Sequence, residues 1–93
     1  DAMEALRLLR ERTFKTGPAW EKAHEIAQTH EGTPVFDAIH ALLHRIEGDT
    51  ANAGYWDRRA GTDYGGGGPE AEFGKIVEMA RSTLMLKIPD GSI

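Results

Sequence analysis

Residues 33–61 read TPVFDAIHALLHRIEGDTANAGYWDRRAG and contain the start and end signals of two consecutive helices. A threonine hydroxyl precedes Pro34, which is typical of an N-cap followed by a first-turn proline. Gly48 ends this helix, Asp49 caps the next, and Gly61 ends that one. A connection this short makes two helices antiparallel neighbours, so the segment predicts a helical hairpin.

The first helix of this hairpin carries apolar residues around much of its circumference. They are Val35, Phe36, Ala38, Ile39, Leu42, Leu43 and Ile46. A surface helix has a narrower apolar stripe. We therefore expect this helix to be central, with other helices packed on several of its sides.

Three further helices are expected outside the hairpin, over residues 2–13, 18–30 and 69–84. Prolines at the first turn open the second and third of them. Residues 62–69 contain four consecutive glycines and read as a flexible linker. Residues 85–93 contain a proline and a glycine and read as an extended tail. The prediction is an all-α fold of two stacked antiparallel hairpins plus a C-terminal helix.

The composition predicts one folded domain spanning residues 1–93. Hydrophobic residues are 40% and charged residues 28%, which is unlike a disordered chain. The net charge of −4 argues against a nucleic-acid binder and against docking on an anionic membrane. No apolar run approaches the ~18 residues of a membrane span. Because there is no cysteine, a disulfide framework and a zinc–thiolate site are excluded, and a cytoplasmic location is favoured.

The spacing of Gly48, Ala53 and Ala60 resembles the second helix of a tetratricopeptide or Sel1-like repeat. In that pattern small alanines let two helices approach closely. Ala23 precedes Ala53 by thirty residues and repeats the spacing. Asp57 stands where the pattern has an aromatic residue. The resemblance implies a TPR-like hairpin, without the three or more repeats that a solenoid needs.

A second resemblance rests on longer motifs. Residues 40–49 read His-Ala-Leu-Leu-His-Arg-Ile-Glu-Gly-Asp, and Asn-Ala-Gly-Tyr-Trp follows over residues 52–56. An Ala-His-Glu-Ile-Ala-Gln segment precedes them over residues 23–28. Together they resemble a family of small uncharacterised proteins, over about residues 20–61 of this chain. Because no activity is assigned to that family, the resemblance implies a fold and no function.

Two histidines one helical turn apart are the first candidate site. His40 and His44 are at i and i+4, a spacing that can place two imidazoles on one metal ion, although the glutamate of the HExxH motif is missing. His24 could reach them if the hairpins stack. We interpret the pair as structural side chains packed between helices, and a metal site formed by His24, His40 and His44 is the alternative. The hydrogen-bond partners expected for a structural role are Asp49, Asn52 and Tyr55.

A second candidate is one face of the helix that follows. Its members, at i, i+3, i+4 and i+7, are Asn52, Tyr55, Trp56 and Arg59. Aromatic, amide and guanidinium groups together are typical of a recognition surface. The alternative is that Trp56 is a core residue and Arg59 pairs with a carboxylate. Arg45, close to Glu47, is interpreted as part of a structural ion pair between helices.

The function expected from the sequence is that of a non-catalytic helical module that binds a protein or a small ligand. Its candidate binding residues are the three histidines, Arg45 and the face around Trp56. The alternative is a metal-binding protein or metal-dependent enzyme that uses the three histidines. No cofactor motif is present, and a homo-oligomer stays open.

Overall fold

The computed structural model describes residues 2–11 and 15–86, which are helical apart from short connections. The helices are α1 (Ala2–Glu11), α2 (Pro18–Thr29), α3 (Pro34–Ile46), α4 (Thr50–Ala60) and α5 (Pro69–Leu86). The all-α prediction is confirmed. The predicted extended tail was wrong for residues 85 and 86, which continue α5, because no helix-breaking residue occurs before Pro89. The rest of the predicted tail and the predicted end of the first helix lie outside the described residues.

The capping of α4 follows the sequence, whereas the capping of α3 follows it only in part. The Asp49 carboxylate accepts a hydrogen bond from the backbone N–H of Asn52. At the start of α3, Thr33 is the N-cap residue as predicted, but its hydroxyl makes no capping bond. The carboxylate of Asp37 instead accepts from the backbone N–H of Gly32 at 3.1 Å and secures the entry to the helix.

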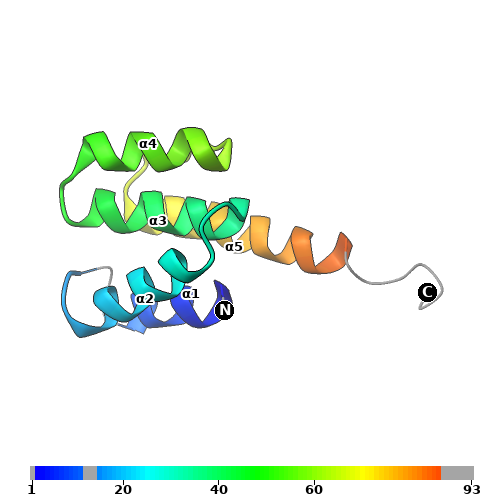
Figure 1. Ribbon diagram of the computed structural model, residues 1–93, viewed down its shortest axis with the longest axis horizontal. Coiled ribbons are helices and arrows are strands. Elements are labelled where there is room, and N and C mark those ends of the chain that lie inside the picture. Colours follow the sequence, from blue (N-terminus) through cyan, green and yellow to red (C-terminus); the bar gives the residue numbers. More distant parts are fainter. Residues whose placement is uncertain (1, 12–14, 87–93) are drawn as a thin grey trace.

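Helix α3 is the centre of the molecule, as predicted. It contacts each of the other four helices, while α1 pairs with α2 and α4 pairs with α3. Figure 1 shows α3 between α4 on one side and the α1–α2 pair on the other, with α5 crossing behind it. Ala23 and Ala53 are both completely buried, so small residues allow close helix approach at the two positions that share the alanine spacing.

The glycine-rich linker between α4 and α5 packs against the rest of the protein. Tyr64 is partly buried on the hydrophobic core, and the ammonium of Lys75 lies 5.8 Å from its ring centroid. Gly65 lies so close to Arg45 that a Cβ added to it would come within 2.8 Å of the guanidinium carbon. The linker is therefore fitted to the side chain beside it.

Across the described part of the chain, every helix is too short or too polar to cross a lipid bilayer.

Candidate metal centre

Three of the four histidines of the chain meet between α2 and α3. His24 comes from α2, and His40 and His44 come from successive turns of α3. One ring nitrogen from each lies within 4.8 Å of those of the other two. The Nε2 atoms of His24 and His40 are 3.0 Å apart. Two imidazoles on a tetrahedral zinc ion place their ligating nitrogens roughly 3.3–3.4 Å apart, so this pair is close to the spacing that a shared ion requires.

The three rings form an edge-to-face arrangement. His40 and His44 are nearly parallel, with centroids 5.0 Å apart and planes inclined by 15°. The ring of His24 stands nearly perpendicular to both, at 4.7 Å from His40 and 5.5 Å from His44. The spacing of one helical turn explains the parallel pair. The third ring, which approaches from another helix, completes a convergent set.

Both tryptophans of the chain lie against these rings. Trp20 stacks on His24 with centroids 5.0 Å apart, and its indole N–H donates to the carbonyl of Leu43 at 2.8 Å. Trp56, from α4, stacks on His40 at 3.9 Å and is 8% exposed. Two indoles therefore pack against the imidazole rings of His24 and His40. Binding of a ligand to these rings should change the fluorescence of both tryptophans.

A carboxylate fixes the orientation and tautomer of the third ring. The Nδ1–H of His44 donates to the Glu47 carboxylate with a 2.6 Å separation. An ionised carboxylate only accepts, so Nδ1 carries a proton, and in the neutral ring the lone pair is then on Nε2. Carboxylate–histidine pairs of this kind orient metal-ligating imidazoles in proteins.

Burial keeps the inner rings neutral. His40 is 2% exposed, and burial, followed by the nearby charges of His24 and His44, lowers its pKa from 6.5 to about 4. The pKa of His24 is also lowered, first by burial and then by the charge of His44. At neutral pH both imidazoles are therefore uncharged, the form in which histidine binds metals.

One atom of the cluster is left without a partner. Nδ1 of His40 is buried, and no group in the described part of the chain bonds to it. A neutral imidazole has one N–H and one lone pair, and Nε2 of this ring faces Nε2 of His24. Within the described residues, only one of the two nitrogens of His40 therefore has a partner, and that partner is another imidazole nitrogen.

The hydrogen bonds of the histidines differ from those expected from the sequence. Asp49 and Asn52 bond to each other, with the amide of Asn52 donating to the carboxylate at 2.7 Å. The hydroxyl of Tyr55 accepts from the guanidinium of Arg59 at 3.0 Å. The histidines turn toward α2 and toward Glu47, so the expectation that α4 and its cap supply their partners was wrong.

The predicted recognition face on α4 is only partly exposed. Trp56 is buried, as in the alternative interpretation, whereas Tyr55 is 43% exposed. The guanidinium carbon of Arg59 lies 5.8 Å from the Tyr55 ring centroid and 5.1 Å from that of Trp56. In the described residues its hydrogen bond goes to the Tyr55 hydroxyl and not to a carboxylate. What remains exposed for an external partner is the Tyr55 ring, Arg59 beside it, and Asn52, whose amide already donates to Asp49.

Arg45 belongs to a separate, ionic cluster. Its guanidinium makes two hydrogen bonds to Glu72 on α5, at 2.9 and 2.7 Å, and two to Asp57 on α4, at 3.0 and 3.1 Å. The hydrogen bonds that it donates to Glu72 and then to Asp57 raise its pKa, against the opposing effect of burial. The sequence correctly indicated a structural ion pair between helices, but the partners are these two acids and not Glu47, which bonds to His44.

The residues that sequence reasoning missed are Trp20, Asp57 and Glu72. All three act across helix–helix contacts and carry no local motif.

No protein-family model matches this chain, and neither a curated protein nor a solved structure is significantly similar to it.

Proposed function

We propose that this protein binds one divalent transition-metal ion, zinc in the first instance, through His24, His40 and His44. The observation that carries the proposal is the convergence of three imidazole nitrogens, from two helices, within 4.8 Å of one another. Three histidine ligands form one of the common zinc sites in proteins, and they leave a fourth position for water or another ligand.

The protonation states of the rings support metal binding. Burial holds His40 and His24 in the uncharged form at neutral pH. The bond to Glu47 keeps the proton of His44 on Nδ1 and leaves its Nε2 free to ligate. Little proton release is then needed when a metal binds, which favours affinity near neutral pH.

The donor set also selects the class of metal. Imidazole nitrogens suit zinc, copper and nickel, whereas magnesium and calcium prefer oxygen ligands. The chain has no cysteine, so a thiolate cannot contribute. A second group, formed by His44, Glu47 and Asp49, also has its ligand atoms within 4.8 Å, but its members already bond to each other or to Asn52. We therefore assign the metal to the three histidines, with Glu47 as the residue that orients His44.

The main alternative is that the histidines serve only for packing. Buried polar groups in proteins are normally hydrogen-bonded. The cluster meets that standard poorly, because Nε2 of His40 faces only Nε2 of His24 and the two nitrogens need a proton between them to bond. A packing role would also leave unexplained why three imidazoles gather with one nitrogen of each within 4.8 Å of the others.

Direct zinc binding is the decisive measurement. Protein purified without an affinity tag is stripped with EDTA and titrated with zinc against a chromophoric chelator. We expect a stoichiometry of one, and at least about a tenfold loss of affinity in His24→Ala and in His44→Ala. His30→Ala is the matched control, because His30 lies outside the cluster and its ring bonds to the carbonyl of Ile26 at 3.0 Å. No zinc binding, or equal losses in the control, would refute the proposal.

Tryptophan fluorescence gives an independent readout. Both indoles stack on proposed ligands, Trp20 on His24 and Trp56 on His40. Copper(II) or nickel(II), which quench nearby indoles, should therefore quench most of the emission at one equivalent. His44→Ala, which keeps both stacks, should remove this stoichiometric quenching. Persistent quenching in that variant would show that the metal binds elsewhere.

A further inference from the structure

A groove on the opposite side of α3 from α4 is the second place where the molecule gathers side chains suited to a ligand. It has a volume of about 500 Å³ and is lined by residues of α1 and α5. Ligand sites commonly have volumes of ~300–1,000 Å³, so the groove is of a size for a small molecule. A stable protein–protein contact would need ~800 Å² of surface from each partner, over 20–30 residues, and the eight residues that line this groove are too few for it.

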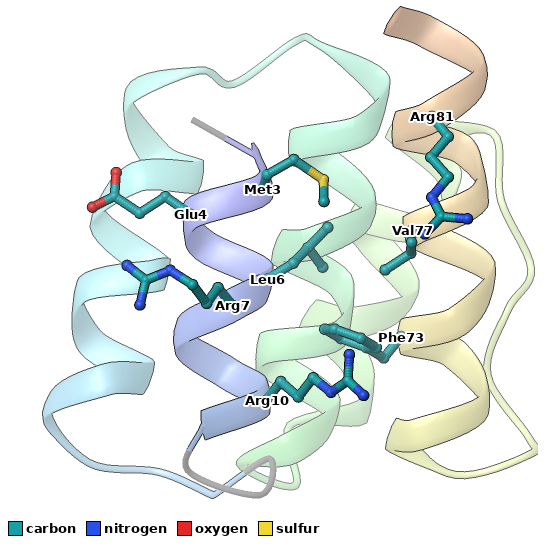
Figure 2. Close-up of a pocket in the computed structure, with 8 residues that line it drawn as sticks. All are labelled: Met3, Glu4, Leu6, Arg7, Arg10, Phe73, Val77 and Arg81. Carbon is teal, nitrogen blue, oxygen red and sulfur yellow. The ribbon is translucent and has the colours of Figure 1, made fainter.

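The floor of the groove is apolar. Met3, Leu6, Phe73 and Val77 point toward one another from the two helices (Figure 2). Leu6 is buried, Phe73 and Val77 are partly exposed, and Met3 is 44% exposed. Contact with an aliphatic chain would remove this surface from water.

The rim of the groove is cationic on a chain that is acidic overall. Three arginines and one glutamate line it, which leaves a net positive charge of two, whereas the whole chain carries −4. Figure 2 shows Arg10 beside Phe73 at one end of the apolar row and Arg81 above Val77 at the other. The groove therefore combines an apolar floor with guanidinium groups at both ends.

These arginines are available to an external anion. In the described residues no carboxylate pairs with Arg10. Arg81 faces Glu78 at 3.8 Å and Arg7 faces Glu11 at 2.8 Å, and all four of these side chains are more than half exposed. Exposed ion pairs of this type contribute ~0–1 kcal/mol each, so a ligand carboxylate can replace them at little cost.

We propose that this groove binds a free fatty-acid anion of medium chain length. The helical rise of 1.5 Å per residue separates positions 73 and 81 by roughly 12 Å along α5. An extended alkyl chain advances roughly 1.3 Å per carbon, given a C–C bond of ~1.5 Å. A chain of about ten carbons therefore spans the floor and brings its carboxylate to a terminal arginine. This site is independent of the histidine cluster.

The test uses sodium decanoate below its micellar concentration, with EDTA present so that metal plays no part. Backbone amide chemical shifts and calorimetry should show saturable binding of one decanoate, with shift changes confined to α1, α5 and their neighbours on α3. Decyltrimethylammonium, which has the same chain with a cationic head, should bind about tenfold more weakly or worse. This comparison needs only the unmodified protein.

Charge reversal tests the arginines. Arg10→Glu/Arg81→Glu should weaken decanoate binding about tenfold or more, because it removes both guanidinium groups from the rim. Lys22→Glu/Arg58→Glu changes the net charge equally at exposed positions of α2 and α4, and it should bind like the unmodified protein. The proposal is overturned by equal affinity for the cationic amphiphile, by full binding in the first double variant, by loss in the second, or by the absence of saturable binding. Binding only to phosphatidylglycerol vesicles, and not to free decanoate, would also overturn it in favour of a membrane surface.

Discussion

Two clusters of polar side chains lie beside α3, and they differ in how many of their buried polar atoms have hydrogen-bond partners. The cluster around Arg45 is ionic and saturated: its guanidinium makes four hydrogen bonds to Asp57 and Glu72, and within the described residues no buried polar side-chain atom of the three lacks a partner. The histidine cluster is unsaturated, since Nδ1 of His40 lacks a partner within the described residues, and Nε2 of His40 and Nε2 of His24 face each other. A saturated network fixes the positions of helices but has no capacity left for a ligand. Ring nitrogens that converge without saturating one another can still bind a ligand. We therefore interpret the Arg45 cluster as structural and the histidine cluster as a candidate site.

The largest effect is expected from breaking the saturated cluster. Glu72 is 1% exposed, so Glu72→Ala leaves the guanidinium of Arg45 with half of its partners. Breaking a buried pair at one side costs ~3–5 kcal/mol. We expect the free energy of unfolding in urea to fall by about 3 kcal/mol, while Glu70→Ala, at an exposed position one half-turn away, changes it by less than ~1 kcal/mol.

Replacing all three charged residues sharpens this prediction. Arg45→Met/Asp57→Asn/Glu72→Met removes the charges together and should recover most of the loss, since well-packed uncharged side chains can substitute for a buried ion pair. A triple variant as unstable as Glu72→Ala would mean that the cluster has a role beyond pairing charges.

Metal should affect only the unsaturated cluster. Zinc that is held at 100 times its dissociation constant stabilises a folded protein by ~2.7 kcal/mol. For a domain of this size the melting temperature should rise by roughly 10–20 °C. Differential scanning fluorimetry with zinc or with EDTA measures the shift. His44→Ala should abolish it and Glu72→Ala should retain it, whereas a shift of equal size in both variants would place the metal elsewhere.

The metal-free protein should lose stability in mild acid because of His40. Its pKa is about 4 in the folded protein and 6.5 in the unfolded chain, so the unfolded state binds the extra proton between these values. Above pH 6.5 the ring is neutral in both states and the free energy of unfolding does not depend on its titration. As the pH falls from 6.5 toward 4, the free energy of unfolding decreases by at most ~1.4 kcal/mol per pH unit.

Urea titrations at pH 7, 6 and 5, with EDTA present, measure this slope. His40→Phe keeps a ring against Trp56 but cannot be protonated, so its profile should be flatter. His30→Ala should follow the unmodified protein. A slope unchanged in His40→Phe would assign the acid sensitivity to another group.

The sequence predicts the helices of this fold better than it predicts either cluster. Pro34, Asp49 and Gly61 act on the backbone within a few residues, so helix boundaries could be predicted locally. The pairing of His40 with His44 is equally local. The contribution of His24 depends on how α2 packs against α3. The sequence therefore predicted that His24 joins the other two histidines only if the two hairpins stack.

The bonds of the clusters are set by tertiary packing. Glu72 lies 27 residues from Arg45 and Asp57 lies 12, and no spacing rule connects them. The expected partners of the histidines were placed on α4 because α4 follows in sequence, whereas the rings face α2 and Glu47. The arginines of α1 have the spacing of an ordinary solvated helix face, and their position beside α5 depends on how the two helices pack.

The smallest effect concerns the glycine-rich linker, where the saturated cluster imposes a constraint. A Cβ at position 65 would lie 2.8 Å from the Arg45 guanidinium carbon, 3.0 Å from Nε and 3.1 Å from the nearest terminal nitrogen. The end of a free arginine could move aside, but four hydrogen bonds hold this one in place. We therefore expect Gly65→Ala to reduce the free energy of unfolding by about 1 kcal/mol.

The control is Gly74→Ala, inside α5, where no atom outside the backbone of the helix lies within 4 Å of the added Cβ. This variant should instead increase the free energy of unfolding by up to ~1 kcal/mol, since alanine favours helix. The cause is tested in an Arg45→Ala background, where the cost of Gly65→Ala should disappear because the two effects are coupled. If the cost persists there, the linker glycine is required by its own backbone and the ionic cluster plays no part.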